Sequence, residues 1–217
     1  MDPMDIISHP MYLAPVGLYV RLYAAKRMLV DLDASFVKQT YRNRALIAAE
    51  NGALPLTIPV VHNGGAKQPM RDVRISEHGN WRRMHWNAIV SAYKKSPFFD
   101  YYADDFRPFY EKRYEFLADF NMQLHHIVCS LLGLDREVAT LGGVESSAQL
   151  LDCRPLAEPS TIAGTHQRYY QVFEQRNGFL PHLSIADLLF NMGPEGLITL
   201  RDSAECLNGA NTDDHES

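Results

Sequence analysis

The chain of 217 residues is 46% hydrophobic and 22% charged, and its formal net charge at pH 7 is −5. These values are typical of one globular domain with a sizeable core, and they exclude a fibrous or intrinsically disordered chain. The acidic balance argues against a protein whose whole surface binds nucleic acid, because such surfaces carry a basic excess.

The cysteines and the first residues narrow the class of protein further. Cys129, Cys153 and Cys206 are odd in number and widely spaced, with no CxxC pair, so neither structural zinc nor a disulfide framework is expected. The first ten residues lack the basic start and apolar stretch of a secretory signal. No window approaches the roughly 18 apolar residues that a membrane span needs. We therefore expect a cytoplasmic protein.

The N-terminal third predicts a β-α-β unit. Residues 11–13 are typical of a short extended segment, which a Pro15-Val16-Gly17 turn separates from a helix at residues 18–26. An apolar strand at residues 28–32 completes the unit.

A β-hairpin is predicted within residues 44–61. Two apolar runs flank Asn51-Gly52, a pair that favours tight hairpin turns because both residues tolerate positive φ. Pro55 and Pro59 have no backbone N–H to donate, so the second strand is expected at a sheet edge.

The middle of the chain predicts one short strand and two helices. The strand is at residues 72–75, and the first helix, at residues 80–95, has one apolar face. An aromatic connection at residues 98–106 leads to a long helix at residues 107–132. Its apolar residues keep a period of about 3.6 until Gly133 ends it.

Beyond residue 134 the pattern is weaker. It indicates two strands and one short helix, at residues 138–141, 169–173 and 147–151. A clearer helix follows at residues 185–191, with Ser184 as its N-cap and Asp187 as the capping-box partner. Gly193-Pro194 is expected to end this helix.

These elements predict an α/β (or α+β) fold. A single domain would span residues 1–207, with a β-α-β start, a β-hairpin and a largely helical second half. The polar residues 208–217 are expected to form a disordered C-terminal tail.

The densest polar cluster lies between the β-α-β unit and the hairpin. Its cations and its hydroxyl and amide groups are suited to a phosphate, a carboxylate or a nucleotide diphosphate, because arginine presents a rigid fork to such anions. The alternative is a solvated loop or strand edge. The candidate ligand-binding residues are Lys38, Tyr41, Arg42, Asn43 and Arg44.

A second cluster opens the helix at residues 80–95. Trp81 and His85 are i,i+4 neighbours on one helix face. An anion or sugar bound at the N-terminus of this helix would gain from the helix dipole and its free amides. Trp81 is therefore a candidate ligand-binding residue and His85 a candidate catalytic base, with a core tryptophan and a hydrogen-bonded core histidine as the alternatives.

Short motifs of known chemistry are absent from the sequence. There is no Walker loop, GxGxxG, GxSxG or HExxH. His125 and His126 are adjacent on the predicted long helix and so face different directions, which disfavours a shared metal. We expect no metal and no cofactor.

The order of several segments resembles the WbqC-like protein family. The resemblance covers roughly residues 11–134 and 169–200, and five segments in the family's order are more specific than any one of them. These segments are YLAPVGLY, KQTYRNRALI, LPLTIPV, ISEHGNWRRMHWNAIVSAYKKSPFFDYY and LPHLSIADLLFNMGPEG. The chain departs from the family's usual form in its opening, which lacks the common double aromatic before the second proline, and at residues 135–168, which are loosely patterned.

The resemblance implies a setting and a substrate class. The family is associated with bacterial surface-polysaccharide loci, including O-antigen synthesis, and some members are described as amino-acid transferases acting on sugars. Our leading hypothesis is an enzyme or enzyme-like protein that transfers an acyl or aminoacyl group to a nucleotide-linked amino sugar, with phosphate held by Lys38, Arg42 and Arg44 and with His85 as the general base. The expected partner is thus a small nucleotide sugar or another phosphate-bearing ligand, and not a nucleic acid.

The alternative is a non-catalytic binding or assembly protein of the same pathway. Its interaction surface would be the aromatic residues 97–110, because aromatic residues and arginine are enriched at binding hot spots. A cleft containing Arg42, Arg44 and His85 together favours the enzyme, whereas exposure of the aromatic residues on a flat face favours the binding protein.

Overall fold

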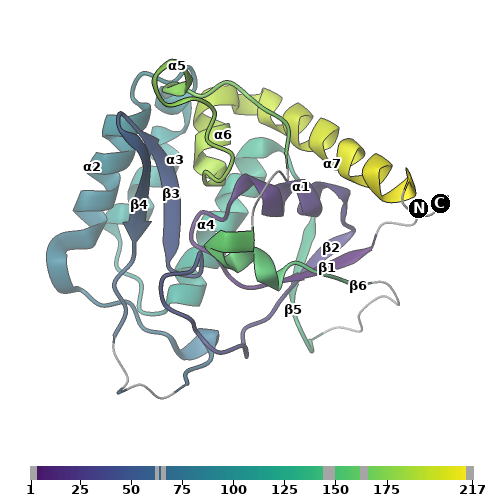
Figure 1. Ribbon diagram of the computed structural model, residues 1–217. Coiled ribbons are helices and arrows are strands. Elements are labelled where there is room, and N and C mark those ends of the chain that lie inside the picture. The colour runs from purple at the N-terminus through teal and green to yellow at the C-terminus, as the bar shows by residue number, and fades with distance from the viewer. Residues whose placement is uncertain (1–3, 62–63, 65–66, 144–149, 162–165, 214–217) are drawn as a thin grey trace.

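The computed structural model describes residues 4–61, 64, 67–143, 150–161 and 166–213. It is a mixed α/β fold built around a parallel sheet of four strands, with a separate antiparallel hairpin and a largely helical second half (Figure 1). The strands are β1 Asp5–Ser8, β2 Arg27–Val30, β3 Arg44–Ala49, β4 Gly52–Thr57, β5 Glu137–Thr140 and β6 Leu150–Asp152. The helices are α1 Val16–Ala24, α2 Trp81–Tyr93, α3 Phe99–Glu111, α4 Leu117–Leu132, α5 Glu174–Asn177, α6 Ile185–Met192 and α7 Gly196–Asp213.

The parallel sheet has the strand order β5-β2-β1-β6. The order β1-α1-β2 confirms the predicted β-α-β start. The first strand, however, is Asp5–Ser8, whereas residues 11–13 are predicted to form it. Those residues form the buried loop between β1 and α1, where the positive φ of Leu13 (42°) is incompatible with a strand.

The hairpin of β3 and β4 confirms the second prediction. Ala49 pairs with Gly52, so the connecting loop is Glu50-Asn51, and Gly52 takes the positive φ of 111° that a side chain would oppose. Pro55 lies opposite Leu46 in a sheet of only two strands, where a missing donor is tolerated. The hairpin packs against α2 and α6, and it stands away from the parallel sheet (Figure 1).

Helix α6 is the centre of the core. The ring of Phe190 lies 5.0–5.1 Å, centroid to centroid, from the rings of Tyr93, Phe99 and Phe106. Aromatic pairs at this separation add to the stabilisation from burial. This cluster joins α2, α3 and α6, and it confirms the predicted helices at residues 80–95 and 185–191.

The capping role predicted for Asp187 is not what the structure contains. The Ser184 side chain makes no cap hydrogen bond to α6. Asp187 is fully buried, and its carboxylate accepts hydrogen bonds from the hydroxyls of Tyr93 (2.8 Å) and Tyr169 (2.9 Å). The Asp187 side chain thus links α6 to α2 through Tyr93 and to the segment before α5 through Tyr169. The strand predicted at residues 169–173 is not formed: residues 169–171 have no regular secondary structure, and residues 172–173 form a turn.

The long helix predicted at residues 107–132 is two helices, α3 and α4. The connecting residues run alongside the segment after Met70–Asp72: Ile75 N–H donates to the carbonyl of Glu115 (2.9 Å), and Leu117 N–H donates to that of Val73 (2.8 Å). The same contacts replace most of the strand predicted at residues 72–75. The aromatic residues 98–106 belong largely to α3, which begins at Phe99.

The C-terminal part differs most from the prediction. Strand β5 confirms the strand at residues 138–141, whereas the helix predicted at 147–151 falls mostly outside the described residues and ends in β6. Helix α7 extends to Asp213, through residues predicted as a disordered tail. Once its first turns pack on α1, each further residue adds a hydrogen bond without a new nucleation step. No helix in the described part of the chain combines the length and apolar character needed to cross a membrane.

Candidate functional site

The carboxyl ends of β1, β2 and β6 meet where the chain changes direction across the sheet. From β1 the chain moves outward to β2 and then β5, and it returns to the other side of β1 as β6. Ligands of open parallel sheets bind outside the carboxyl ends of the strands at such a switch point. His9 directly follows β1, Asp31 directly follows β2, and Arg154 is the second residue after β6.

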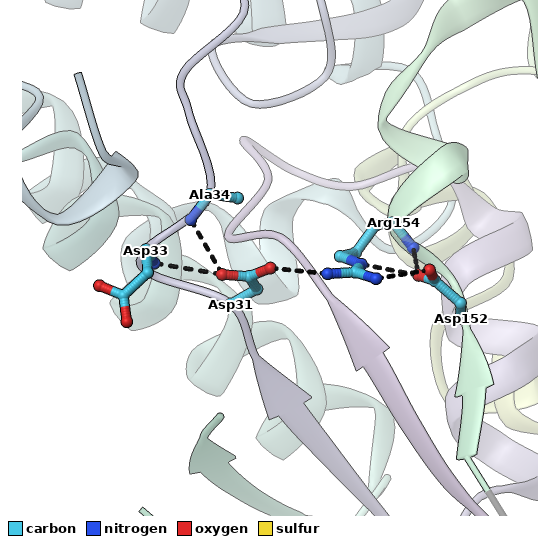
Figure 2. A network of polar contacts seen from close by, with 5 residues as sticks. All are labelled: Asp31, Asp33, Ala34, Asp152 and Arg154. Atoms are coloured by element: carbon cyan, nitrogen blue, oxygen red, sulfur yellow. Dashed lines mark hydrogen bonds and ion pairs between the residues drawn. The ribbon is translucent and has the colours of Figure 1, made fainter. Parts of the chain in front are cut away.

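A chain of ion pairs links the ends of β2 and β6 (Figure 2). Arg154 Nη1 donates to Asp31 Oδ2 (3.0 Å), while Nε and Nη2 donate to the two oxygens of Asp152 (2.9 and 2.8 Å). The other oxygen of Asp31 accepts the backbone N–H groups of Asp33 (3.1 Å) and Ala34 (2.9 Å). Arg154 is therefore held from two sides by carboxylates.

The two carboxylates stay ionised. Burial raises the pKa of Asp31, but hydrogen bonds from Arg154 and from the turn amides outweigh it, so that the net shift is downward. The pKa of Asp152 is lowered mainly by its hydrogen bond with Arg154, whose own pKa is raised by the two carboxylates. The network is charged at any pH near neutrality.

His9 lies among these charges as a neutral ring. It is 6% exposed, and its Nδ1 has no hydrogen-bond partner. Burial and the charge of Arg42 lower the pKa of His9 to about 4, Arg154 adds to this effect, and Asp31 opposes it. At neutral pH the imidazole is unprotonated and can accept a proton.

Arg42 brings a second guanidinium to the site. Its Nη1 donates to Thr40 Oγ1 (3.1 Å) and to Glu158 Oε1 (3.0 Å), and its buried Nε has no partner. The Arg42 side chain is 7% exposed, whereas that of Glu158 is 41% exposed. The cation is thus fixed in the fold, and its anionic partner reaches it from the surface.

Asn121 of α4 holds the two loops of the site together. Its Nδ2 donates to the carbonyls of Pro10 (3.2 Å) and Arg42 (2.8 Å), and the residue is fully buried. Its Oδ1 has no partner, like His9 Nδ1 and Arg42 Nε. Leaving a buried polar atom unpaired costs about 1–3 kcal/mol, so several such atoms near one strand end point to a place where a ligand binds. We call the following residues the strand-end site: His9, Asp31, Arg42, Asp152, Arg154 and Glu158.

The polar cluster predicted from the sequence is divided among different contacts. Arg42 belongs to the strand-end site, and the backbone N–H of Tyr41 donates to Ala157 beside it (2.8 Å). Asn43 is buried and donates to the carbonyl of Ile58 (3.0 Å), while Arg44 lies on β3 and donates to Thr57 Oγ1 (3.2 Å). Lys38 is exposed. The structure therefore does not direct Arg42 and Arg44 to one common partner.

Trp81 and His85 lie in the core. His85 Nδ1 is 3.0 Å from the Tyr12 hydroxyl, which is itself 2.9 Å from that of Tyr110, and the His85 ring packs against Trp81 at 5.1 Å. Burial lowers the pKa of His85 to about 4, with a smaller opposing effect from the Thr57 backbone. Among the described residues, no hydrogen bond or ring contact joins His85 to Arg42 or Arg44.

Most of the aromatic residues at 97–110 are packed inside the molecule. Phe99, Phe106 and Tyr110 are buried, and Tyr101 alone among the rings of this stretch is largely exposed, at 78%. A flat exposed aromatic face, the feature that favours a binding protein, is not formed by these residues.

Sequence reasoning missed His9, Asp31, Asp152, Arg154 and Glu158. The available signal was positional: a polar residue directly after a short apolar strand, as in Ile6-Ile7-Ser8-His9 and Leu29-Val30-Asp31. This signal depends on knowing that β1, β2 and β6 are parallel neighbours, which only the fold supplies.

The chain is similar in sequence to a known protein and to one protein family. The uncharacterized protein Rv1507c of Mycobacterium tuberculosis is 29% identical over 220 residues, a match covering 88% of this chain and 94% of the relative. No solved structure is significantly similar to the chain. The sequence profile of the WbqC-like protein family matches residues 9–155, from the first residue of the strand-end site to the residue after Arg154. Because this match spans more than half of the chain, the protein belongs to the WbqC-like protein family.

Proposed function

We propose that this protein is a cytoplasmic transferase of bacterial surface-polysaccharide biosynthesis. It transfers an acyl or aminoacyl group to a nucleotide-linked amino sugar bound at the strand-end site. The observation that carries the proposal is the position of two arginines, Arg42 and Arg154, around a neutral histidine, His9, whose Nδ1 is unpaired, at the switch point of a parallel sheet.

The arginines provide for the nucleotide part of the substrate. Guanidinium groups bind phosphate through paired, charge-assisted hydrogen bonds, and they do so best when they are held in place. Thr40 and Asn121 hold the Arg42 side chain and backbone, and Asp31 holds Arg154. The other residues predicted from the sequence are proposed to support the ligand site or the fold. They are Lys38, Tyr41, Asn43, Arg44 and Trp81.

The reaction is nucleophilic attack by the sugar amine on the carbonyl carbon of the donor. The new C–N bond forms as the bond between the carbonyl carbon and the leaving group breaks, and the leaving group departs with that electron pair. The amine proton passes to a base in the site. We assign this role to His9, whose Nδ1 is unpaired, in preference to His85, whose Nδ1 is bonded to Tyr12.

A ligand-binding experiment tests the substrate class. UDP-glucosamine is expected to raise the melting temperature of the wild type, because a ligand that binds only the folded state stabilises it by mass action. Arg154→Gln removes an arginine whose side chain is 38% exposed, so the fold should survive while the shift is lost. Arg176→Gln is the matched control, because Arg176 pairs with Glu50 at the far end of the hairpin.

Transfer itself is followed by mass spectrometry. The purified protein is incubated with UDP-glucosamine and either acetyl-coenzyme A or glycyl adenylate, and the nucleotide sugar is examined for the added acyl or glycyl mass. An unchanged nucleotide sugar together with no thermal shift would remove the support for a transferase and favour a binding or assembly protein of the same pathway.

A further inference from the structure

Each arginine of the strand-end site is paired with one carboxylate that reaches it from solvent. Glu158, with a side chain 41% exposed, bonds Arg42, and Asp152, with a side chain 47% exposed, bonds Arg154. Asp31 differs in burial, because its side chain is only 8% exposed and its second oxygen accepts two backbone N–H groups, whereas Asp152 accepts one, from Arg154 (2.9 Å). The site therefore contains two solvent-accessible anions and one buried anion.

With its present ion pairs, the site carries too much negative charge to bind a further anion. The charged side chains around neutral His9 comprise two cations and three anions. A ligand with two phosphates would meet a net negative site unless the exposed carboxylates left. Removing Glu158 and Asp152 from the arginines leaves two cations against Asp31 alone, which favours an anionic ligand.

We propose that Glu158 and Asp152 occupy the two phosphate positions of a diphosphate-binding site, and that the diphosphate of the substrate displaces both. This inference rests on the proposed function, from which it takes a nucleotide-linked substrate, and it names how that substrate enters. The exchange is feasible because water reaches both carboxylates, whose side chains are 41% and 47% exposed, and because a phosphate can engage an arginine fork with two charge-assisted bonds.

The backbone that carries the two carboxylates is anchored, so the exchange needs only side-chain rotation. Cys153 N–H donates to the carbonyl of Ile7 (2.8 Å), and Ala157 O accepts from Tyr41 N–H (2.8 Å). Cys153, Leu156 and Ala157 are buried. Asp152 and Glu158 thus lie at the two ends of a fixed segment. Turning towards water costs Glu158 its bond to Arg42, and it costs Asp152 its bonds to the guanidinium and the backbone N–H of Arg154.

Displacement has a consequence for His9. The charges of Arg42 and Arg154 hold the pKa of His9 low, in addition to its burial. A diphosphate bound to both arginines offsets those charges more strongly than the two carboxylates do, so the imidazole becomes a stronger base when the substrate is present. Substrate binding and base activation are then coupled.

Calorimetric titration with inorganic pyrophosphate tests the inference directly. Glu158→Gln removes the competing charge and keeps the shape of the side chain, so pyrophosphate should bind roughly three- to fivefold more tightly than to the wild type. Asp152→Asn should act in the same direction, and Arg154→Gln should abolish binding. Glu50→Gln is the control, because Glu50 is an exposed ion-pair partner at the hairpin tip. The strand that leads from residue 44 to this tip is about 20 Å long.

The outcomes separate this inference from the proposed function. If pyrophosphate binds the wild type and Glu158→Gln equally, or binds the variant less well, displacement is wrong while the substrate class stands. If no variant binds pyrophosphate, the diphosphate site itself is wrong. If binding tightens in Glu158→Gln but UDP-glucosamine is never modified, the site stands and the transferase does not. An NMR titration of the His9 ring adds an independent reading, in which pyrophosphate should raise its pKa above about 4.

Discussion

Two buried histidines have different surroundings: His9 lies in the strand-end site, and His85 lies in the core. His9 and His85 both have a pKa lowered to about 4 by burial, yet only His9 leaves Nδ1 unpaired beside two arginines. His85 is bonded to Tyr12 and stacked in an aromatic cluster. The identity of the residue therefore carries less information than its neighbours do.

This contrast gives a prediction about the two residues. His85→Ala removes a core ring and the partner of the Tyr12 hydroxyl, and should lower the free energy of unfolding by about 2–4 kcal/mol. His9→Ala should change stability much less, but should reduce the rate of transfer by about 10²–10⁴-fold if His9 is the base. Denaturant unfolding and transfer kinetics on both variants check it. A folded His85→Ala protein that has lost transfer, beside an active His9→Ala protein, would return the role of base to His85.

Asp187 predicts a pH dependence of stability. Burial raises its pKa from 3.8 to about 7, although hydrogen bonds from Tyr93, Tyr169 and Asn191 oppose the shift. Since the folded pKa lies above the unfolded one, the stabilisation is complete below about pH 4 and is lost as the pH rises towards 7. The loss is on the order of 4 kcal/mol if the full shift applies.

The measurement compares wild type and Asp187→Asn by urea unfolding at several values of pH between 4.5 and 7.5. The wild type should lose stability relative to the variant across this range, because asparagine does not ionise. Parallel curves for the two proteins would mean that the three hydrogen bonds keep the carboxylate ionised throughout.

Helix α4 supports the strand-end site through one side chain, that of Asn121. Asn121 joins the loop after β1 to the loop before β3, because its amide donates to Pro10 and Arg42. Asn121→Ala should destabilise the protein by about 2–3 kcal/mol, since it leaves two buried carbonyls without donors. Ligand affinity should fall as well, because His9 and Arg42 lose their common support. Asn87→Ala on α2, a residue that makes no side-chain hydrogen bond in the described part of the chain, is the matched control for unfolding and for pyrophosphate titration.

The elements that the sequence predicts well are those determined by local patterns. The hairpin is predicted from Asn51-Gly52, although its loop is Glu50-Asn51 and Gly52 already pairs with Ala49. Helices α2 and α6 follow from their apolar periodicity. The break between α3 and α4 has no local signal, because the apolar period continues through it and the extended connection is held by backbone bonds to residues 73–75. Likewise, Asp187 has the spacing of a capping box, and only the distant tyrosines reveal its actual partners.

At the scale of the whole molecule, the candidate site combines loops from four distant parts of the chain. Arg42 could be selected from the sequence because it lies in a dense run of polar residues. Asp31 and Arg154 could not, because each is a single charge after a strand of three or four residues, and β6 has no alternating pattern to identify it. Their meeting is a property of the strand order β5-β2-β1-β6.

The pairing of β1 with β6 also determines when the site can exist. Asp5 pairs with Leu150, and the intervening chain must be closed into a loop before that contact forms. Contacts of such large sequence separation are made late and slowly, because the entropy of loop closure is lost before the contact stabilises the chain. A chain emerging from the ribosome therefore can form the hairpin and α2 early, but it acquires Asp152, Arg154 and Glu158 only after synthesis has passed residue 158. We expect a newly synthesised molecule to be unable to hold its ligand until this last strand has docked.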